Sequence, residues 1–317
     1  MRIFLALGTS LVLGLIAGPF IIKKLKEYKL GQQIRLEGPA EHLNKQGTPT
    51  MGGFIFIAAT LAGALIWNRI HPQNLLLLMG MVLFGLIGLW DDTQKIKKAQ
   101  SEGLSARQKI LLNLFFGILM AVLLQIDAPD TLNVAIPFTQ RSLLLPLWLF
   151  VPFIVLFYTA VTNSVNLADG IDGLCGSVSL IVSLFYVAYG LKTGSLTVAV
   201  FAAVLAGALL AYLAYNWHPA RVFMGDTGSF ALGGALATLS VLTHTELLFL
   251  LVGLIYVLES LTVILQVISF KTRGKRIFLM TPIHHHFEKK GWSEVKIVGL
   301  FSLFTLLCCL IAYVTLT

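Results

Sequence analysis

Charged residues are scarce in this chain. Only 12% of the 317 residues are charged, whereas 57% are hydrophobic and the mean hydropathy is +0.85. A chain so poor in charge is not built of soluble domains, although its length alone would allow two of them. Cysteine is also scarce, because Cys175, Cys308 and Cys309 are the only three and all fall in apolar stretches. They make no disulfide framework.

Long hydrophobic runs take up most of the chain. A membrane-spanning helix needs roughly 20 apolar residues, and ten stretches approach that length, with brief connections and no internal repeat. They are residues 3–22, 51–70, 74–90, 109–126, 146–165, 174–190, 195–215, 229–243, 247–269 and 295–316. The sequence therefore predicts an all-α polytopic membrane protein with about ten transmembrane helices. It also predicts a single integral-membrane domain over residues 1–317.

The distribution of lysine and arginine predicts the orientation. Of the 23 basic residues, 19 fall in the segments 23–50, 91–109, 216–227 and 270–296. Because basic loops stay in the cytoplasm, these segments are expected inside and both termini outside. The net charge of +8 therefore reflects the orientation of the chain in the membrane. It does not indicate nucleic-acid binding, because the basic residues are dispersed over several loops. In the outer loop 127–145, the alternation at residues 132–136 favours a short hairpin.

Aspartates are few, and most of them gather at one membrane edge. Five of the seven lie at ends of predicted spans on the cytoplasmic side, namely Asp91, Asp92, Asp169, Asp172 and Asp226. Carboxylates near lipid usually mark an ion or substrate site. Helix capping is the alternative for Asp172 and Asp226, which precede apolar runs. Capping does not account for Asp91 and Asp92, which follow a span ending at Trp90, where the helix dipole disfavours negative charge.

Two cytoplasmic segments could bind an anion or a cation. Residues 38–53 are rich in Gly and Pro and carry Lys45 and Thr50, which suit an anionic ligand; Thr50 could instead cap the second span. Adjacent Asp91 and Asp92 need a cation or a basic neighbour such as Lys95 to stay ionised together. Surface charge pairing is one possibility. A divalent metal is the other, because Mg²⁺ is bound by one or two carboxylates together with substrate phosphates.

Two further segments combine turns with polar side chains. Residues 162–173 hold two Asp-Gly pairs, whose turns can aim backbone N–H groups at an anion, together with Asn163 and Asn166. They lack the distal Glu and the other oxygen ligands of an EF-hand. Residues 216–229 place Phe223 on a polar loop, where its ring is expected to be exposed and could stack on a planar base. Residues 162–173 carry more polar groups than a turn alone requires.

The C-terminal part has three consecutive histidines, His284, His285 and His286. On a helix they fan apart by about 100° each and cannot all bind one ion. The zinc-protease pattern His-Glu-x-x-His is absent, so donors to a diphosphate or a sugar are favoured. Glu259 is the one acidic residue inside a predicted span, which implies a partner, a water cavity or a helix break. Gln266 could join the same polar pocket.

Five segments in this order resemble a known family. They are residues 47–53, 91–92, 166–174, 223–229 and 282–288, and the resemblance covers the whole chain. The family is that of the polyprenyl-phosphate N-acetylhexosamine-1-phosphate transferases. The Pro-Thr-Met-Gly-Gly and His-His-His-Phe-Glu segments favour its phospho-N-acetylmuramoyl-pentapeptide branch. Ala168 stands where the family often has Thr.

The resemblance implies an activity and a place for it. Undecaprenyl phosphate would attack UDP-N-acetylmuramoyl-pentapeptide at the cytoplasmic face of a bacterial plasma membrane, giving UMP and the first lipid-linked peptidoglycan precursor, lipid I. Catalysis would depend on Mg²⁺ held mainly by Asp226. Asp91 and Asp92 would serve as base, nucleophile or metal-supporting carboxylates, by direct displacement or through a phospho-aspartate. Substrate contacts would come from Lys45, Thr50, Lys95, Lys109, Asn166, Asp169, Asp172, Asn216, Phe223, Gln266, His284 and His285.

Within this set the resemblance assigns narrower roles. Phe223 would stack on uracil, Lys95 and Lys109 would attract the lipid phosphate, and His284 and His285 would contact the diphosphate or the sugar. A homodimer would match the family's habit. Two other functions compete: a sister transferase that uses UDP-N-acetylglucosamine, and a secondary transporter. Transporters usually hold their charges near the bilayer midplane and often contain inverted repeats, so carboxylates at one edge and the lack of a repeat disfavour a transporter.

Overall fold

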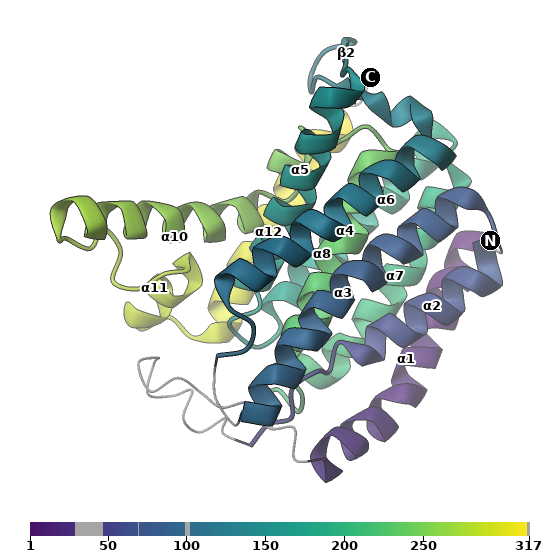
Figure 1. The fold of residues 1–317 in the computed structure, drawn as a ribbon. Helices are drawn as coiled ribbons and strands as arrows, with labels where there is room; N and C mark the ends of the chain where they lie inside the picture. The colour runs from purple at the N-terminus through teal and green to yellow at the C-terminus, as the bar shows by residue number, and fades with distance from the viewer. Residues whose placement is uncertain (29–46, 69, 99–101, 316–317) are drawn as a thin grey trace.

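The computed structural model describes residues 1–28, 47–68, 70–98 and 102–315 (Figure 1). Lys45, one of the expected substrate-binding residues, lies outside them. The described helices of the protein are α1 (Arg2–Glu27), α2 (Phe54–Asn68), α3 (Pro72–Lys98), α4 (Ala106–Asp127), α5 (Leu147–Leu167), α6 (Leu174–Thr193), α7 (Leu196–Asn216), α8 (Gly225–Leu242), α9 (Phe249–Val252), α10 (Leu254–Arg273), α11 (Ile283–Lys289) and α12 (Glu294–Val314). A 3₁₀ turn, η2 (Pro129–Leu132), and the strands β1 (Asn133–Ala135) and β2 (Ser142–Leu144) complete the described elements.

Most of these helices are long and apolar enough to cross a membrane. Eight of the described helices meet this condition by length and composition: α1, α3, α4, α5, α6, α7, α10 and α12. The protein is therefore an all-α polytopic membrane protein, as the sequence predicts. Helices α2 and α8 occupy the two remaining predicted stretches; α2 has 15 residues, and α8 is buried over nearly its whole length.

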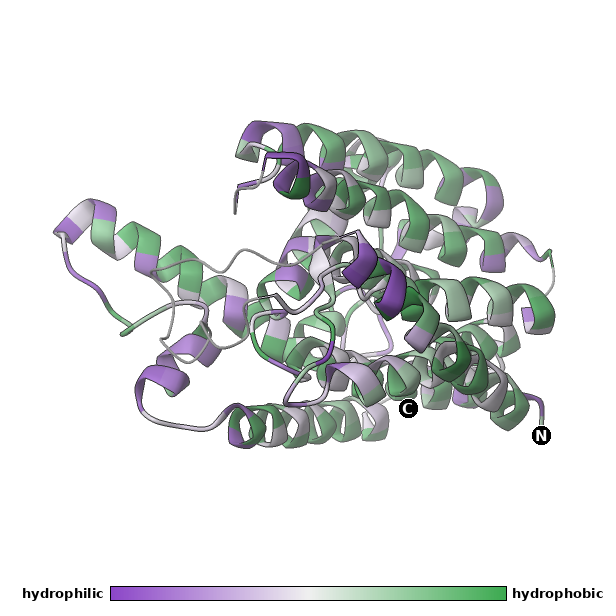
Figure 2. Cartoon of the chain, turned by 90° about the horizontal axis from the view of Figure 1, so that it is seen from below, coloured by the Kyte–Doolittle hydropathy of each residue, from purple (hydrophilic) through white to green (hydrophobic). Residues whose placement is uncertain are grey.

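The bundle is arranged around α7. In its most apolar stretch 83% of α7 is buried, against 28% for α1, α4 and α10, so α7 is central and the other three face outward. Figure 2 shows hydrophobic residues along the helices and hydrophilic segments near their ends.

The expected hairpin is present, since β1 pairs antiparallel with β2. The three cysteines are buried and unbridged, as predicted.

Helix α3 extends beyond its predicted end. The hydrophobic run stops at Trp90, but the helix continues to Lys98, so Asp91 and Asp92 lie inside it rather than after it. The prediction that the pair follows the helix is therefore wrong. No Gly or Pro interrupts residues 91–98, and the lysines of the last turn complement the negative end of the helix dipole. The helix thus projects its carboxylates past the apolar bundle.

Helices α3 and α8 pack backbone against backbone along a glycine seam, which consists of Gly80 and Gly88 on α3 and Gly234 on α8. A Cβ atom added to Gly88 would overlap the carbonyl oxygen of Asp226. One on Gly80 would overlap the Thr238 hydroxyl, and one on Gly234 would overlap the Gly80 carbonyl oxygen. Such small residues let helix backbones approach closely. The seam therefore places the end of α3 beside the first turn of α8.

The predicted span 247–269 is not one helix. It is divided at Gly253 into the short α9 and the longer α10, which is a correction to the sequence-based boundaries. The last buried residue of α10 is Thr262, and beyond it the helix projects away from the bundle with α11 beneath it (Figure 1). The hydropathy averaged along the sequence does not reveal the break at Gly253, because the helices on both sides of it are apolar.

Candidate active site

Three carboxylates converge where α3 meets α8. Asp91, Asp92 and Asp226 each offer an oxygen within 4.8 Å of the others. Asp226 lies in the first turn of α8 and does not cap it, because the N-cap position is Met224. Instead Asp92 accepts hydrogen bonds from the Thr227 N–H at 2.8 Å, the Thr227 hydroxyl at 2.7 Å and the Asp226 N–H at 3.2 Å. A carboxylate of α3 thus satisfies the free N–H groups that begin α8.

Two lysines neutralise much of this charge. Lys95 Nζ lies 2.7 Å from Asp91 Oδ2 and 3.0 Å from Asp226 Oδ2. Lys109 Nζ, on α4, lies 3.1 Å from Asp91 Oδ1 and 3.1 Å from Asp226 Oδ2. With all groups ionised, three carboxylates and two ammonium groups leave one net negative charge. The side chain of Asp226 is 15% exposed, that of Asp92 3% and that of Asp91 not at all, so a ligand reaches Asp226 first.

The donor set of this acidic cluster fits a hard divalent cation. Such cations take oxygen ligands and are held by few carboxylates plus substrate phosphates. The lysine ammonium groups now lie where a cation would balance the carboxylates. Asp91, Asp92 and Asp226 are therefore the residues that would hold it.

Two neighbouring segments close around Asp226. Asn166 Nδ2, at the end of α5, donates to Asp226 Oδ1 at 3.0 Å and to Ser229 Oγ at 2.8 Å. Gly225 adopts a positive φ of 73°, and a Cβ atom there would lie 2.8 Å from both Asp92 Oδ2 and Thr50 Oγ1. Thr50 thus belongs to this junction. It does not cap α2, which begins four residues later at Phe54.

Asp169, in the loop before α6, is a fourth carboxylate that interacts electrostatically with the acidic cluster. Burial raises the pKa of Asp169 well above its usual range, and the nearby charges of Asp226 and Asp92 raise it further. Asp169 thus lies close enough to the acidic cluster to share its electrostatics.

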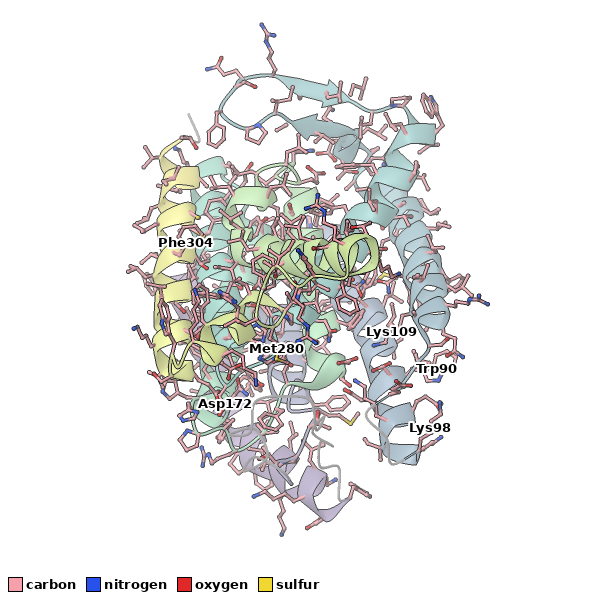
Figure 3. All side chains as sticks on the ribbon, turned by 90° about the vertical axis from the view of Figure 1, so that its left-hand side faces the viewer. Trp90, Lys98, Lys109, Asp172, Met280 and Phe304 are labelled. Atoms are coloured by element: carbon pink, nitrogen blue, oxygen red, sulfur yellow. The ribbon has the colours of Figure 1, made fainter. Side chains whose placement is uncertain are left out.

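Asp172 belongs to a second group that the sequence did not reveal. Its Oδ2 lies 3.1 Å from His218 Nδ1 and accepts the Ala220 N–H at 3.0 Å. Its N–H donates to Glu294 Oε2 at 2.9 Å, and α6 has no side-chain cap. His218 and Glu294 are 46 and 122 residues from Asp172 along the chain. No local pattern could have joined them; the acid opening the last span was the only signal. Figure 3 places Asp172 and Lys98 at the end of the bundle away from the hairpin.

Asn216 and Phe223 organise the loop between α7 and α8. Asn216 is buried; its Oδ1 accepts the Gly173 N–H at 3.0 Å, and its Nδ2 donates to the Val222 carbonyl oxygen at 3.0 Å. Phe223 is half-buried, rather than exposed as the sequence suggested. Its backbone pairs with residues 49–52, because its N–H donates to the Pro49 carbonyl and its own carbonyl accepts the Gly52 N–H.

Gln266, on α10, binds the loop that leads to α11. The Gln266 side chain accepts the N–H groups of Ile277 and Phe278 at 2.9 and 3.0 Å and donates to the Phe278 carbonyl at 3.0 Å. Its amide is thus engaged with the loop in this structure.

The three histidines point to different partners. His284 is fully buried against Glu259, His285 Nδ1 lies 2.5 Å from Glu288 Oε2, and His286 Nδ1 accepts the Leu279 N–H. Each imidazole thus has a different polar partner, although the rings of His284 and His285 lie against each other with their centroids 4.1 Å apart.

Comparisons with known proteins agree with this arrangement. The family model described as glycosyl transferase family 4 matches residues 74–244, and the phospho-N-acetylmuramoyl-pentapeptide-transferase signature 1 matches residues 45–57. A phospho-N-acetylmuramoyl-pentapeptide-transferase of Clostridium botulinum (strain Alaska E43 / Type E3) is 47% identical over 98% of this chain and 95% of its own length. Proteins of the same name from Clostridium beijerinckii and Clostridium perfringens (strain 13 / Type A) are 46% and 45% identical, each over 99% of this chain and over 97% and 99% of their own lengths. The chain belongs to the phospho-N-acetylmuramoyl-pentapeptide-transferase family.

Proposed function

We propose that this protein transfers phospho-N-acetylmuramoyl-pentapeptide from its UDP-linked donor to undecaprenyl phosphate, releasing UMP and forming lipid I. It is an enzyme, a sugar-phosphate transferase that acts on a polyprenyl phosphate. The observation that carries the proposal is the cluster of Asp91, Asp92 and Asp226 with two lysines at one end of a membrane bundle. One substrate is a membrane lipid and the other a soluble nucleotide, so the chemistry requires a site at a membrane edge.

The reaction exchanges one phosphoanhydride for another. An oxygen of the lipid phosphate attacks the sugar-linked phosphorus of the donor, a new P–O bond forms, and the bond to UMP breaks. Asp91, Asp92 and Asp226 would hold a Mg²⁺ ion, which would supply positive charge against the charge that develops on the phosphates. The remaining requirement is to position two anions beside each other, which hydrogen bonds and fixed charges supply.

The residue roles follow from exposure and reach. Asp226, the most exposed of the three carboxylates, is assigned as the principal metal ligand. Each lysine ammonium group has three donors, so Lys95 and Lys109 would contact the phosphate of the lipid while keeping their ion pairs with Asp91. Asn166 orients Asp226, and Thr50 lies beside Asp92.

The donor side is assigned to the loops around Phe223. Its half-buried ring would stack on uracil, and Lys45, Asp169 and His285 would contact the rest of the donor. Asp172, Asn216 and Gln266 would support these contacts through the loops they hold in place.

The hydrogen bonds support direct displacement rather than a phospho-aspartate. Asp92 already accepts three hydrogen bonds, and Asp91 accepts the Leu104 N–H at 2.8 Å in addition to its ion pairs with both lysines. Carboxylates engaged on both oxygens are poor nucleophiles. Rapid quenching during turnover followed by mass spectrometry should find neither Asp91 nor Asp92 phosphorylated. Phosphate on either residue would establish the covalent route instead.

We further propose ten spans in one domain over residues 1–317, with both termini outside, the site at the cytoplasmic face and a homodimer as the working form. The native cysteines are buried, so single cysteines introduced as Glu102→Cys and Thr139→Cys can be labelled selectively in intact cells. An impermeant thiol reagent should label only Thr139→Cys, in the hairpin. Light scattering of the detergent-solubilised protein reports the mass of the assembly.

A transfer assay on purified protein tests the function. Undecaprenyl phosphate and Mg²⁺ are supplied with UDP-N-acetylmuramoyl-pentapeptide, and in parallel with UDP-N-acetylglucosamine. Lipid-linked product and UMP are expected from the first donor only, and are expected to be lost in Asp226→Asn. Asp130→Asn makes the same change at an exposed carboxylate near the hairpin and should leave the rate unchanged. Product from the second donor would identify a sister transferase.

A further inference from the structure

Glu259, on α10, is paired with the buried side chain of His284, on α11. Its Oε1 lies 3.0 Å from Nδ1 of His284 on α11, and neither side chain has any exposed surface. The pair is close enough for an ion pair but lacks the angle of a good hydrogen bond, and among the described residues neither side chain has a hydrogen-bond partner. Buried ionisable groups are costly unless they are paired. The carboxylate and the imidazole therefore depend on each other.

The pair lies at the point where α10 leaves the bundle. Ser260, next to Glu259, donates to the hydroxyl of Ser164 on α5 at 2.7 Å, and α10 has no buried residue after Thr262. Glu259 thus belongs to the anchored part of α10. His284 belongs to α11, which the chain reaches only after turning back from the projecting end (Figure 1). The contact fixes the returning segment to the bundle.

The far side of the imidazole touches residues of the candidate active site. A Cβ atom on Gly170 would overlap Nε2 of His284, so only glycine fits beneath this ring, and Gly170 directly follows Asp169. The His284 ring also lies against the ring of His285, with centroids 4.1 Å apart. One buried side chain therefore contacts both the turn that carries Asp169 and the histidine assigned to the donor.

We propose that Glu259 and His284 are positioning residues for the donor side of the reaction. Glu259 fixes the orientation of the His284 ring, and that ring sets the places of His285 and of the turn at Asp169 and Gly170. Partners behind a working imidazole commonly fix its orientation in this way. His284 then acts from behind the site rather than by touching substrate. The inference rests on the proposed transferase function.

Kinetics of matched variants test the pair. Glu259→Gln keeps the size of the side chain but removes its charge, and is expected to lower kcat/KM for the UDP-linked donor at least tenfold. The KM for undecaprenyl phosphate should change less than twofold, because the lipid phosphate is assigned to the lysines. Glu259→Asp should recover part of the loss. Glu102→Gln, an exposed carboxylate between α3 and α4, is the matched control and should behave as wild type.

A double-mutant cycle measures whether the effects of Glu259 and His284 on donor kinetics depend on each other. If the two residues act as a unit, Glu259→Gln combined with His284→Asn should lose no more than the worse single variant. Multiplied losses would overturn the proposal, as would wild-type donor kinetics in Glu259→Gln or equal losses for both substrates. Should Glu259→Gln fail to fold, Gly170→Ala displaces the same ring from its other side, and unchanged donor kinetics there would refute the inference. Absence of transfer by the wild-type protein would instead refute the proposed function.

Discussion

Glu246, in the loop between α8 and α9, is expected to make stability fall as pH rises. The residue is 1% exposed, and neither carboxyl oxygen has a hydrogen-bond partner within the part of the chain that the structure describes. The hydroxyl groups nearby are already engaged, since that of Tyr186 pairs with Thr245 and that of Tyr189 donates to the Thr243 carbonyl. Burial raises the pKa of Glu246 from its ordinary value of 4.5 to about 8. In the fold, the neutral form of this carboxyl is therefore favoured.

The magnitude follows from the size of this change. Each pKa unit corresponds to about 1.4 kcal/mol, so ionising Glu246 in the fold costs about 5 kcal/mol relative to the unfolded chain. The folded protein binds the extra proton between pH 4.5 and about 8. The free energy of unfolding should therefore decrease across that window and level off above it.

The variant Glu246→Gln removes the ionisation and keeps the shape. Unfolding in detergent can be followed by the fluorescence of the five tryptophans from pH 5 to pH 9. The variant should match wild type near pH 5 and exceed it near pH 9, by up to about 5 kcal/mol. Glu27→Gln, at an exposed carboxylate of α1, should leave the pH dependence of wild type unchanged. Identical pH profiles for wild type and Glu246→Gln would refute the reasoning.

Three further predictions concern the candidate active site. Gly88→Ala inserts a methyl group against the Asp226 carbonyl, at a cost of about 1–3 kcal/mol, and should lower both the melting temperature and the transfer rate, whereas Gly299→Ala, in open space, should lower neither. Lys109→Met removes the ammonium group that lies 3.1 Å from both Asp91 and Asp226 and is assigned to the lipid phosphate. One hydrogen bond to a charged group contributes roughly 1.5–3 kcal/mol, so kcat/KM for undecaprenyl phosphate should fall roughly 10- to 100-fold in initial-rate assays; an unchanged value would show that Lys109 does not bind the lipid phosphate. Phe223→Ala should raise the KM for the UDP-linked donor roughly tenfold, since base stacking contributes about 1–3 kcal/mol, and Phe223→Tyr should restore it if stacking is the cause.

The sequence predicted most of the helices because lipid demands long apolar runs. It misplaced the end of α3, since hydrophobicity stops at Trp90 while helix propensity and backbone hydrogen bonds continue to Lys98. It also missed the break at Gly253, because the residues on both sides are apolar. The hairpin was predictable from local alternation alone.

Convergence at the candidate site was only partly predictable. The adjacency of Asp91 and Asp92 is visible in the chain, and shared polarity at one membrane edge suggested that Asp226 joins them. The contact of Lys95 with Asp91 could be predicted, because the two residues lie one turn apart on the same helix. The contact of Lys109 with Asp226 could not, because it depends on how α4 packs. The pairing of Glu259 with His284 depends on the chain turning back between α10 and α11, which no pattern of residue types records.

The glycine seam has a consequence for how the gene tolerates mutation. At Gly88 and Gly234 the nearest atoms of the facing helix belong to the main chain, so no facing side chain can shrink there to make room for a larger residue. A saturation scan of the gene should therefore find these featureless apolar positions as intolerant as the aspartates themselves. Suppressors of a seam substitution would have to arise by removing a side-chain atom on the facing helix, as at Thr238 opposite Gly80. Where the opposing atom belongs to the backbone, as at Gly88, no single compensating change should exist.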